Sequence, residues 1–466
     1  MSKPAYCLRQ AQATGIYVKG DTMALFSRSK TALRWLLRAD QPVPERSETE
    51  IAAEMKRNFN WNFAFNVLDG SAFTLGVSFI SATTIVPLFL SKLSDSPIPI
   101  GLAAMIAQGS WFLPQLFTAN AVERLARKKP VVVNLGFFTE RLPMWLILLA
   151  AVVAAASPLL ALVLFFIGYA WHGLGAGVVA TAWQDMLARI FPVNRRGRFF
   201  AVTTFIGAGL GTIGASGSAW LLEKYPFPQN FIISFGVAAM AINVSWVFLA
   251  FTREPVQAAQ IPRVNTRQYL AELPQLLRLD PNFRHFLLAR SFLALSGMGM
   301  GFLTVSALQR WQVADSTVGL YTVAILLGQT AGNLFFGLLA DRYGHKLSLE
   351  ISGAAALLSF ALAWLAPEPS WYFLVFALQG VSQGGILISG MMVVLEFSPP
   401  HRRPTYSGIS NTLIGLVNII APLIGTLLAN FNFSALFFVS ALMALVGIML
   451  MRWRVREPRI WVQPGD

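Results

Sequence analysis

The polar residues of this chain are concentrated in short gaps between long apolar stretches, and this pattern limits the folds that it can adopt. Four stretches, 71–90, 131–155, 231–251 and 433–451, each hold 19 or more residues with at most two charges. A helix of roughly 20 residues crosses a hydrocarbon core of about 30 Å. Backbone groups in hydrocarbon cannot bond to water, so only helices and closed barrels can cross it. The alternating pattern of a membrane barrel is absent. We therefore predict an all-α polytopic membrane protein.

Composition supports this prediction. Apolar residues make up 55% of the chain and charged residues 12%, with a mean hydropathy of +0.57. A soluble domain carries about 25% charged residues. We expect twelve transmembrane helices in two six-helix pseudo-symmetric bundles. The predicted spans lie near 62–90, 98–121, 131–155, 158–190, 199–222, 230–251, 284–309, 317–340, 347–366, 371–397, 404–430 and 433–452.

Basic residues are concentrated in one of the two sets of predicted loops. The opposite set holds little more than Lys92, Lys224 and Arg310. The positive-inside rule therefore places both termini in the cytoplasm. The net charge of +14 follows mostly from this bias and from a basic start to the chain, so it does not indicate nucleic-acid binding. The expected segments are a tail (1–60), a first bundle (61–252), a cytoplasmic linker (253–283), a second bundle (284–453) and a short tail (454–466).

The N-terminal tail has a pattern of its own. Residues 24–38 are basic and amphipathic without an acidic residue. This favours a helix on anionic lipid, or a disordered tail, and we expect amphipathic helices in the tail. A targeting segment is the alternative, but it would need a continuous apolar core and a clear cleavage site.

No motif for catalysis or for a cofactor occurs. Cys7 is the single cysteine, and the four histidines show no metal-ligand spacing. A phosphate-binding glycine loop, a nucleophile elbow and a zinc-protease motif are all absent. We expect neither enzymatic activity, nor a cofactor, nor a metal.

Several short sequences occur once in each half of the chain. Residues 337–346 read GLLADRYGHK, and 119–128 are a degraded copy that keeps Glu123-Arg124 and a basic end. Arg-Glu-Pro follows the sixth span at 253–255 and the twelfth at 456–458. An even number of spans per half makes the two halves parallel repeats about an axis along the membrane normal.

The loop at 337–346 resembles the loop signature of the major facilitator superfamily, and the resemblance covers about residues 60–458. Stretches such as 183–186 and 195–200 are similar to a bacterial branch whose substrates are largely uncharacterised. The first-half copy departs from the signature, since Glu123 replaces its Asp and Ala119 and Ala126 replace its glycines. The resemblance implies a transporter with a central cavity lined by spans one, four, seven and ten.

The resemblance also implies a gate at the cytoplasmic rim. Asp341 would dock at the start of span five, and Glu123 would dock near span eleven. Such contacts would bias two states by roughly 1–3 kcal/mol. The alternative is that these residues only enforce topology. The gating candidates are Glu123, Arg124, Asp185, Arg195, Arg198, Gly337, Asp341, Arg342, Gly344, Lys346, Arg402 and Arg403.

Charges within spans are costly and are therefore candidates for function. Asp69 and Arg290 lie at similar depth in spans one and seven, and we hypothesise that they pair in one state. Alternatively, Arg290 snorkels to the interface and Asp69 bonds a neighbouring helix. Glu140 and Arg141 lie near the middle of span three; they need not bond each other, and Glu140 is a candidate for proton coupling or for a structural network.

Uncharged polar residues complete the candidate pathway. Asn66 shares a helical face with Asp69, and Gln379 shares one with Gln383. These residues and Trp183 either contact substrate or form interhelical hydrogen bonds.

These patterns predict a secondary active transporter that moves a small organic solute, with protons as a second partner. We expect a monomer in the bilayer of a bacterial inner membrane, without nucleic acid. The alternatives are a membrane scaffold or assembly factor without transport activity, and a lipid flippase of the same fold.

Overall fold

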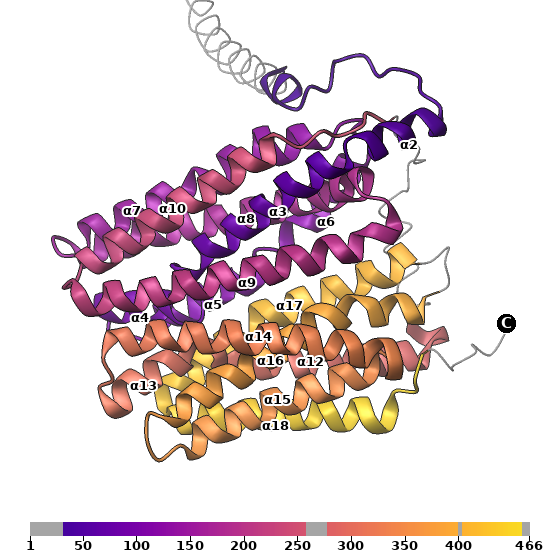
Figure 1. Ribbon diagram of the computed structural model, residues 1–466. Coiled ribbons are helices and arrows are strands. Elements are labelled where there is room, and N and C mark those ends of the chain that lie inside the picture. Colours follow the sequence, from indigo (N-terminus) through magenta and orange to yellow (C-terminus); the bar gives the residue numbers. More distant parts are fainter. Residues whose placement is uncertain (1–30, 258–276, 399–402, 459–466) are drawn as a thin grey trace, which may run out of the picture.

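The computed structural model describes residues 31–257, 277–398 and 403–458, and the regular elements in these ranges are helices. Ten of them are long and apolar enough to cross a membrane. Within each bundle the helices run side by side (Figure 1). The ten candidate spans cover Val131–Val153, Pro158–Ile190, Arg195–Lys224, Gln229–Ala250, Pro281–Trp311, Asp315–Ala340, His345–Leu365, Trp371–Val394, Tyr406–Phe431 and Phe433–Arg454.

The first two predicted spans are each divided into two helices. Residues 62–90 correspond to α3 (Phe59–Ser78) and α4 (Ile85–Leu93), and residues 98–121 correspond to α5 (Ile98–Gly109) and α6 (Leu113–Glu123). Pro114 lies in the first turn of α6, where its missing N–H costs no hydrogen bond. The expectation of one continuous helix was therefore wrong for both segments, and the count of twelve spans stays a prediction.

Two further spans depart from regular α-helix. The third begins as the π-helices η1 (Val131–Leu135) and η2 (Phe137–Arg141) before α7 (Pro143–Val153). The seventh contains the 3₁₀ segment η3 (Gly297–Phe302) between α12 (Pro281–Ser296) and α13 (Leu303–Trp311). Pro143 cannot donate a backbone hydrogen bond, and glycines favour irregular backbone, so both departures have a local cause.

The helices form two groups that follow the two halves of the chain (Figure 1). Helix α9 of the first group packs on α14 of the second, and α5 packs on α17. The remaining helices are α2 (Glu48–Arg57), α8 (Pro158–Ile190), α9 (Val193–Lys224), α10 (Gln229–Ala250), α14 (Asp315–Tyr343), α15 (His345–Leu365), α16 (Trp371–Phe397), α17 (Arg403–Phe431) and α18 (Phe433–Arg454).

The repeated Arg-Glu-Pro sequence has the same backbone partner in both halves. The side-chain amide of Asn62 donates to the Arg253 carbonyl at 2.9 Å and accepts from the Arg253 N–H at 2.8 Å. Asn282 makes the equivalent pair with Arg456, at 3.2 and 2.8 Å. Each pair fastens the chain after the last helix of a bundle to the first helix. We call this end of the molecule the linker end and the opposite end the far end.

The glutamates of the same repeats also contact helix starts. Glu254 accepts from the backbone N–H groups of Lys128 and Lys129 at 2.8–2.9 Å, just before η1. Burial raises the pKa of Glu254, although these amides and nearby cations oppose the shift. Gly344 (φ +97°) begins the equivalent helix α15, and a Cβ placed on it would lie 2.7 Å from Glu457 Oε1. The glutamates of both repeats therefore lie against the start of the third predicted span of their bundle, and for Glu254 this contact consists of hydrogen bonds.

We expect Asn62→Ala and Asn282→Ala to lower the stability of the purified protein by similar amounts. Each change removes the two hydrogen bonds that a buried asparagine makes with the backbone, at a cost of roughly 1–3 kcal/mol. Thermal unfolding in detergent measures the effect. Asn243→Ala is the matched control, because the Asn243 amide bonds the Ala239 carbonyl of its own helix. Equal melting temperatures for all three variants would contradict the clamping role.

Candidate functional site

A cavity of about 360 Å³ lies between the two bundles, in the half of the molecule toward the linker end. Val132 and Leu249, at the linker ends of η1 and α10, line it, and Leu326 and Leu387 line it from the second bundle. The other lining residues are Asn66, Asp69, Gly70, Phe73, Thr74, Trp111, Glu140, Arg141, Ala176, Val179, Ala180, Trp183, Phe199, Phe200, Thr203, Thr204, Ala208, Gln329, Thr330 and Asn333.

The far end is closed by direct contacts between the bundles. Lys92 Nζ lies 2.8 Å from Asp315 Oδ2, and the hydroxyls of Thr84 and Thr322 lie 2.6 Å apart. Helix α14 also packs tightly on α9, since a Cβ on Gly319 would lie 2.6 Å from that of Ala219. From this contact the two helices diverge toward the linker end (Figure 1). The cavity is therefore separated from the far end and lies on the linker side.

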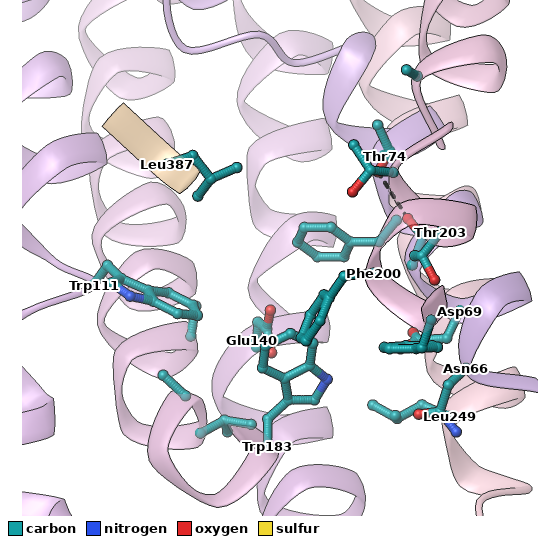
Figure 2. Close-up of a pocket in the computed structure, with 18 of the residues that line it drawn as sticks. Asn66, Asp69, Thr74, Trp111, Glu140, Trp183, Phe200, Thr203, Leu249 and Leu387 are labelled. Carbon is teal, nitrogen blue, oxygen red and sulfur yellow. Dashed lines mark hydrogen bonds between the residues drawn. The ribbon is translucent and has the colours of Figure 1, made fainter. Parts of the chain in front are cut away.

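One wall of the cavity is rich in oxygen atoms. Asn66 and Asp69 come from α3 and Thr203 comes from α9, and the three lie together in Figure 2. Asp69 is buried and accepts a 2.6 Å hydrogen bond from Ser245 of α10. Ser245 satisfies one oxygen of this carboxylate and fixes its orientation. This wall places a carboxylate and two neutral oxygens beside one another.

A buried ion pair occupies another wall. Glu140 and Arg141, adjacent in the π-helix η2, form a salt bridge with each other. The Arg141 guanidinium also lies over the Phe73 ring at 5.5 Å, and the Glu140 carbonyl contacts His172 Nδ1 at 2.7 Å. The two side chains pair because each charge would otherwise be buried without a partner. Sequence spacing alone did not predict this bond.

Aromatic rings fill much of the remaining cavity surface. Figure 2 shows Trp111, Trp183 and Phe200 around the central space, opposite Asp69 and Asn66. Phe199 is held by stacking on Phe191 at 4.5 Å between ring centroids. The site thus combines a polar wall with an apolar body. This arrangement is typical of pockets that bind small organic molecules.

Five of the predicted pathway residues lie together in this cavity: Asn66, Asp69, Glu140, Arg141 and Trp183. The other three do not line it. Gln379 donates to Ser359 at 3.1 Å and Gln383 to Met300 Sδ at 3.5 Å, so both bond helices of their own bundle.

Arg290 is also not among the residues that line this cavity. Its guanidinium is buried against α16, where a Cβ on Gly390 would lie 2.2 Å from it. Among the described ion pairs none joins Arg290 to Asp69, which bonds Ser245 instead. The hypothesis of an Asp69–Arg290 pair therefore has no support in this conformation and remains a hypothesis for another state.

The predicted gating residues that the structure describes lie at the linker end, where several of them form ion pairs. Asp185 lies 3.0 Å from Lys128 and 3.4 Å from Arg189, and Lys346 lies 3.3 Å from Glu350. Burial lowers the pKa of Lys128, and the Asp185 carboxylate acts against this shift. These pairs lie within single bundles, so they organise each rim separately.

The other gating arginines whose side chains the structure describes are exposed. Arg195 and Arg198 are exposed, Arg342 lies over the Tyr343 ring at 5.3 Å, and Arg124 is exposed. A Cβ atom added at Gly337 would lie 4.0 Å from Ile388, so a small side chain would fit at this position. Docking by the acids stays a prediction, because the side chains of Glu123, Asp341 and Arg403, and all of Arg402, lie outside the described residues.

Sequence reasoning missed the contribution of α9 and α14. Thr203, Phe200 and Leu326 line the cavity, although the fifth and eighth spans were not expected to do so. Thr203 carries an isolated hydroxyl in a glycine-rich span, and residues of such spans commonly serve the packing of helices. No pattern in the sequence distinguishes it from the other threonines.

Sequence comparisons match parts of the chain. The family model described as Major Facilitator Superfamily matches residues 295–465. Multidrug resistance protein MdtL of Salmonella typhimurium is 27% identical over 143 residues, which cover 30% of this chain and 36% of that protein. Multidrug resistance protein 3 of Bacillus subtilis is 26% identical over 109 residues, covering 23% and 21%. The chain thus matches about a third or less of the length of these relatives.

Solved structures match most of the chain. The nucleoside transporter NupG has a TM-score of 0.63 at 15% identity, covering 84% of this chain and 99% of that one. The D-xylose-proton symporter has a TM-score of 0.61 at 13% identity, covering 86% and 99%. A third structure, the Major Facilitator Superfamily transporter FucP, has a TM-score of 0.57 at 14% identity, covering 84% and 98%. The chain therefore shares the fold of these transporters, and its second bundle matches the family model of the Major Facilitator Superfamily.

Proposed function

We propose that the protein is a secondary active transporter that works by alternating access. The observation that carries this proposal is the cavity between two bundles that touch at the far end and diverge toward the linker end. A rocking motion of the bundles would open the far end and close the linker end around the same site. The positive-inside rule supports a cytoplasmic linker end in a bacterial inner membrane.

The cavity favours a small, amphipathic organic solute. Its volume of about 360 Å³ lies at the lower end of the range for small-molecule pockets. The aromatic rings would contact an apolar body, and Asn66 and Asp69 would orient a polar group. Two of the relatives are named for multidrug resistance, which is consistent with an organic solute. In this proposal the protein acts as a monomer.

Proton coupling is the second part of the proposal. The carboxylates of Asp69 and Glu140 both line the cavity. Each forms a bond that would change if the carboxylate took up a proton. Protonation of Asp69 would change its bond with Ser245, and protonation of Glu140 would weaken its pair with Arg141. Either change would link the uptake of a proton to the binding of substrate in the cavity.

Transport by purified protein in proteoliposomes tests the proposal. We expect uptake or efflux of an organic solute that increases with a pH gradient. Asp69→Asn is expected to lose at least tenfold in gradient-driven transport, because the proton-binding carboxylate is gone. Glu45→Gln, a change in an exposed residue of the tail, is the control. A protein that folds yet moves no solute from a broad panel would favour the scaffold alternative.

The ion pair at the far end gives a second prediction. Lys92→Gln and Asp315→Asn should each destabilise the far-closed state by about 0.2–1 kcal/mol, as expected for a partly exposed pair. The far-open population would then increase by up to roughly fivefold. The rate at which an impermeant maleimide labels Val305→Cys, in a Cys7→Ser background, reports this change, since Val305 is buried near the pair.

The charge swap Lys92→Asp with Asp315→Lys is the matched control and should restore slow labelling. Labelling rates that do not change in either single variant would show that this pair does not hold the far end closed.

A further inference from the structure

Two oxygen atoms in the oxygen-rich wall of the cavity have no hydrogen-bond partner among the described residues. Asn66 is 2% exposed, and its amide nitrogen donates to the Asn62 carbonyl at 2.8 Å and to Thr252 Oγ1 at 3.1 Å. These bonds fix the orientation of the amide, and its Oδ1 atom receives no hydrogen bond from any residue that the structure describes. A buried oxygen without a donor costs free energy that a suitable ligand would recover.

Thr203 presents a second buried oxygen of this kind. A threonine in a helix usually donates to the carbonyl four residues earlier, as Thr74, Thr212 and Thr330 do here. The methyl group of Thr203 instead packs against Gly70, where a Cβ would lie 2.4 Å from it. Its hydroxyl oxygen is buried and has no hydrogen-bond partner in the described ranges 31–257, 277–398 and 403–458. The close approach of α3 and α9 at Gly70 therefore fixes how this side chain is placed.

The charges around this wall leave one carboxylate in excess. Among the described residues that line the cavity, Asp69 and Glu140 are acidic and Arg141 is basic. Arg141 is paired with Glu140, whereas the hydrogen bond that Asp69 accepts within the described part of the chain comes from the neutral Ser245. A cation beside Asp69 would balance the charge of the lining residues in a region where unbalanced charge is costly.

Aromatic rings face this wall across the cavity. Phe200 and Trp183 lie opposite Asn66 and Asp69 in Figure 2, and both line the same space. The faces of such rings attract cations. An apolar group attached to the cation would pack on the rings at the same time.

We propose that the substrate is a protonated primary or secondary amine attached to an apolar or aromatic body. Its N–H groups would donate to Asn66 Oδ1, to the Asp69 carboxylate and to Thr203 Oγ1. A quaternary ammonium ion has the same charge but no N–H, so it would leave the neutral oxygens without donors. This inference rests on the proposed transport function and specifies the substrate class of the same cavity.

Binding to the purified full-length protein in detergent tests the inference. The probes are 2-phenylethylamine, its N,N,N-trimethyl analogue and the neutral 2-phenylethanol, and tryptophan fluorescence is the readout because Trp111 and Trp183 line the site. We expect the amine to bind at least tenfold more tightly than either of the other two. Equal or tighter binding of the trimethyl analogue, or no binding of the amine, would overturn the inference.

A matched pair of variants locates the effect. Thr203→Val keeps the side-chain shape and removes the hydroxyl, so amine affinity should decrease roughly three- to tenfold while the trimethyl analogue is unaffected. Thr212→Val, on the same helix, removes a hydroxyl that bonds the Ala208 carbonyl, and it should change neither affinity. Equal weakening of both probes by Thr203→Val would indicate a packing effect and overturn the donor assignment.

The transport assay separates this inference from the proposed function. If the amine does not bind but the liposomes move a different solute, the substrate class is wrong and the transporter assignment stands. If the amine binds with the expected preference but no solute crosses the membrane, the site assignment stands and the transport proposal fails.

Discussion

The hydrocarbon environment requires almost every polar group of this protein to find its partner inside the protein. The helices satisfy their own backbone, but the chain after each bundle and the charges within the bundles need other partners. In each half an asparagine, Asn62 or Asn282, forms the same two hydrogen bonds with the backbone of the chain that follows the bundle. The Glu140–Arg141 bridge pairs two of the charges within the first bundle. The oxygens left without donors are therefore informative, because they are exceptions to a strict rule.

Close contact between the bundles is concentrated away from the linker end. At the far end Gly319 allows α14 to approach α9, and the threonine and lysine–aspartate contacts add polar bonds. Toward the linker end the cavity separates the same two helices. The two bundles are packed closely at the far end and separated toward the linker end. Because packed interfaces tend to be bistable, we expect a second arrangement in which the linker end is closed and the far end is open.

The second half of the chain carries the clearer signature of the family, in sequence as well as in loop chemistry. Residues 337–346 retain the full motif, and the family match covers 295–465. The oxygen-rich wall of the cavity, in contrast, comes from the first half. The half that matches the family model is therefore not the half that contributes the oxygen-rich wall of the cavity.

The sequence by itself determined the class of this protein, because apolar runs of membrane length allow few structures other than helices. It also identified Asn66, Asp69, Glu140, Arg141 and Trp183, since polar and charged residues within such runs are rare. It could not determine that Glu140 bonds Arg141, that Gln379 and Gln383 face their own bundle, or that Arg290 lies apart from Asp69. These outcomes depend on helix rotation and on breaks such as the π-helices before Pro143. Such features arise from packing between distant segments, so only the tertiary structure decided which polar groups share the cavity.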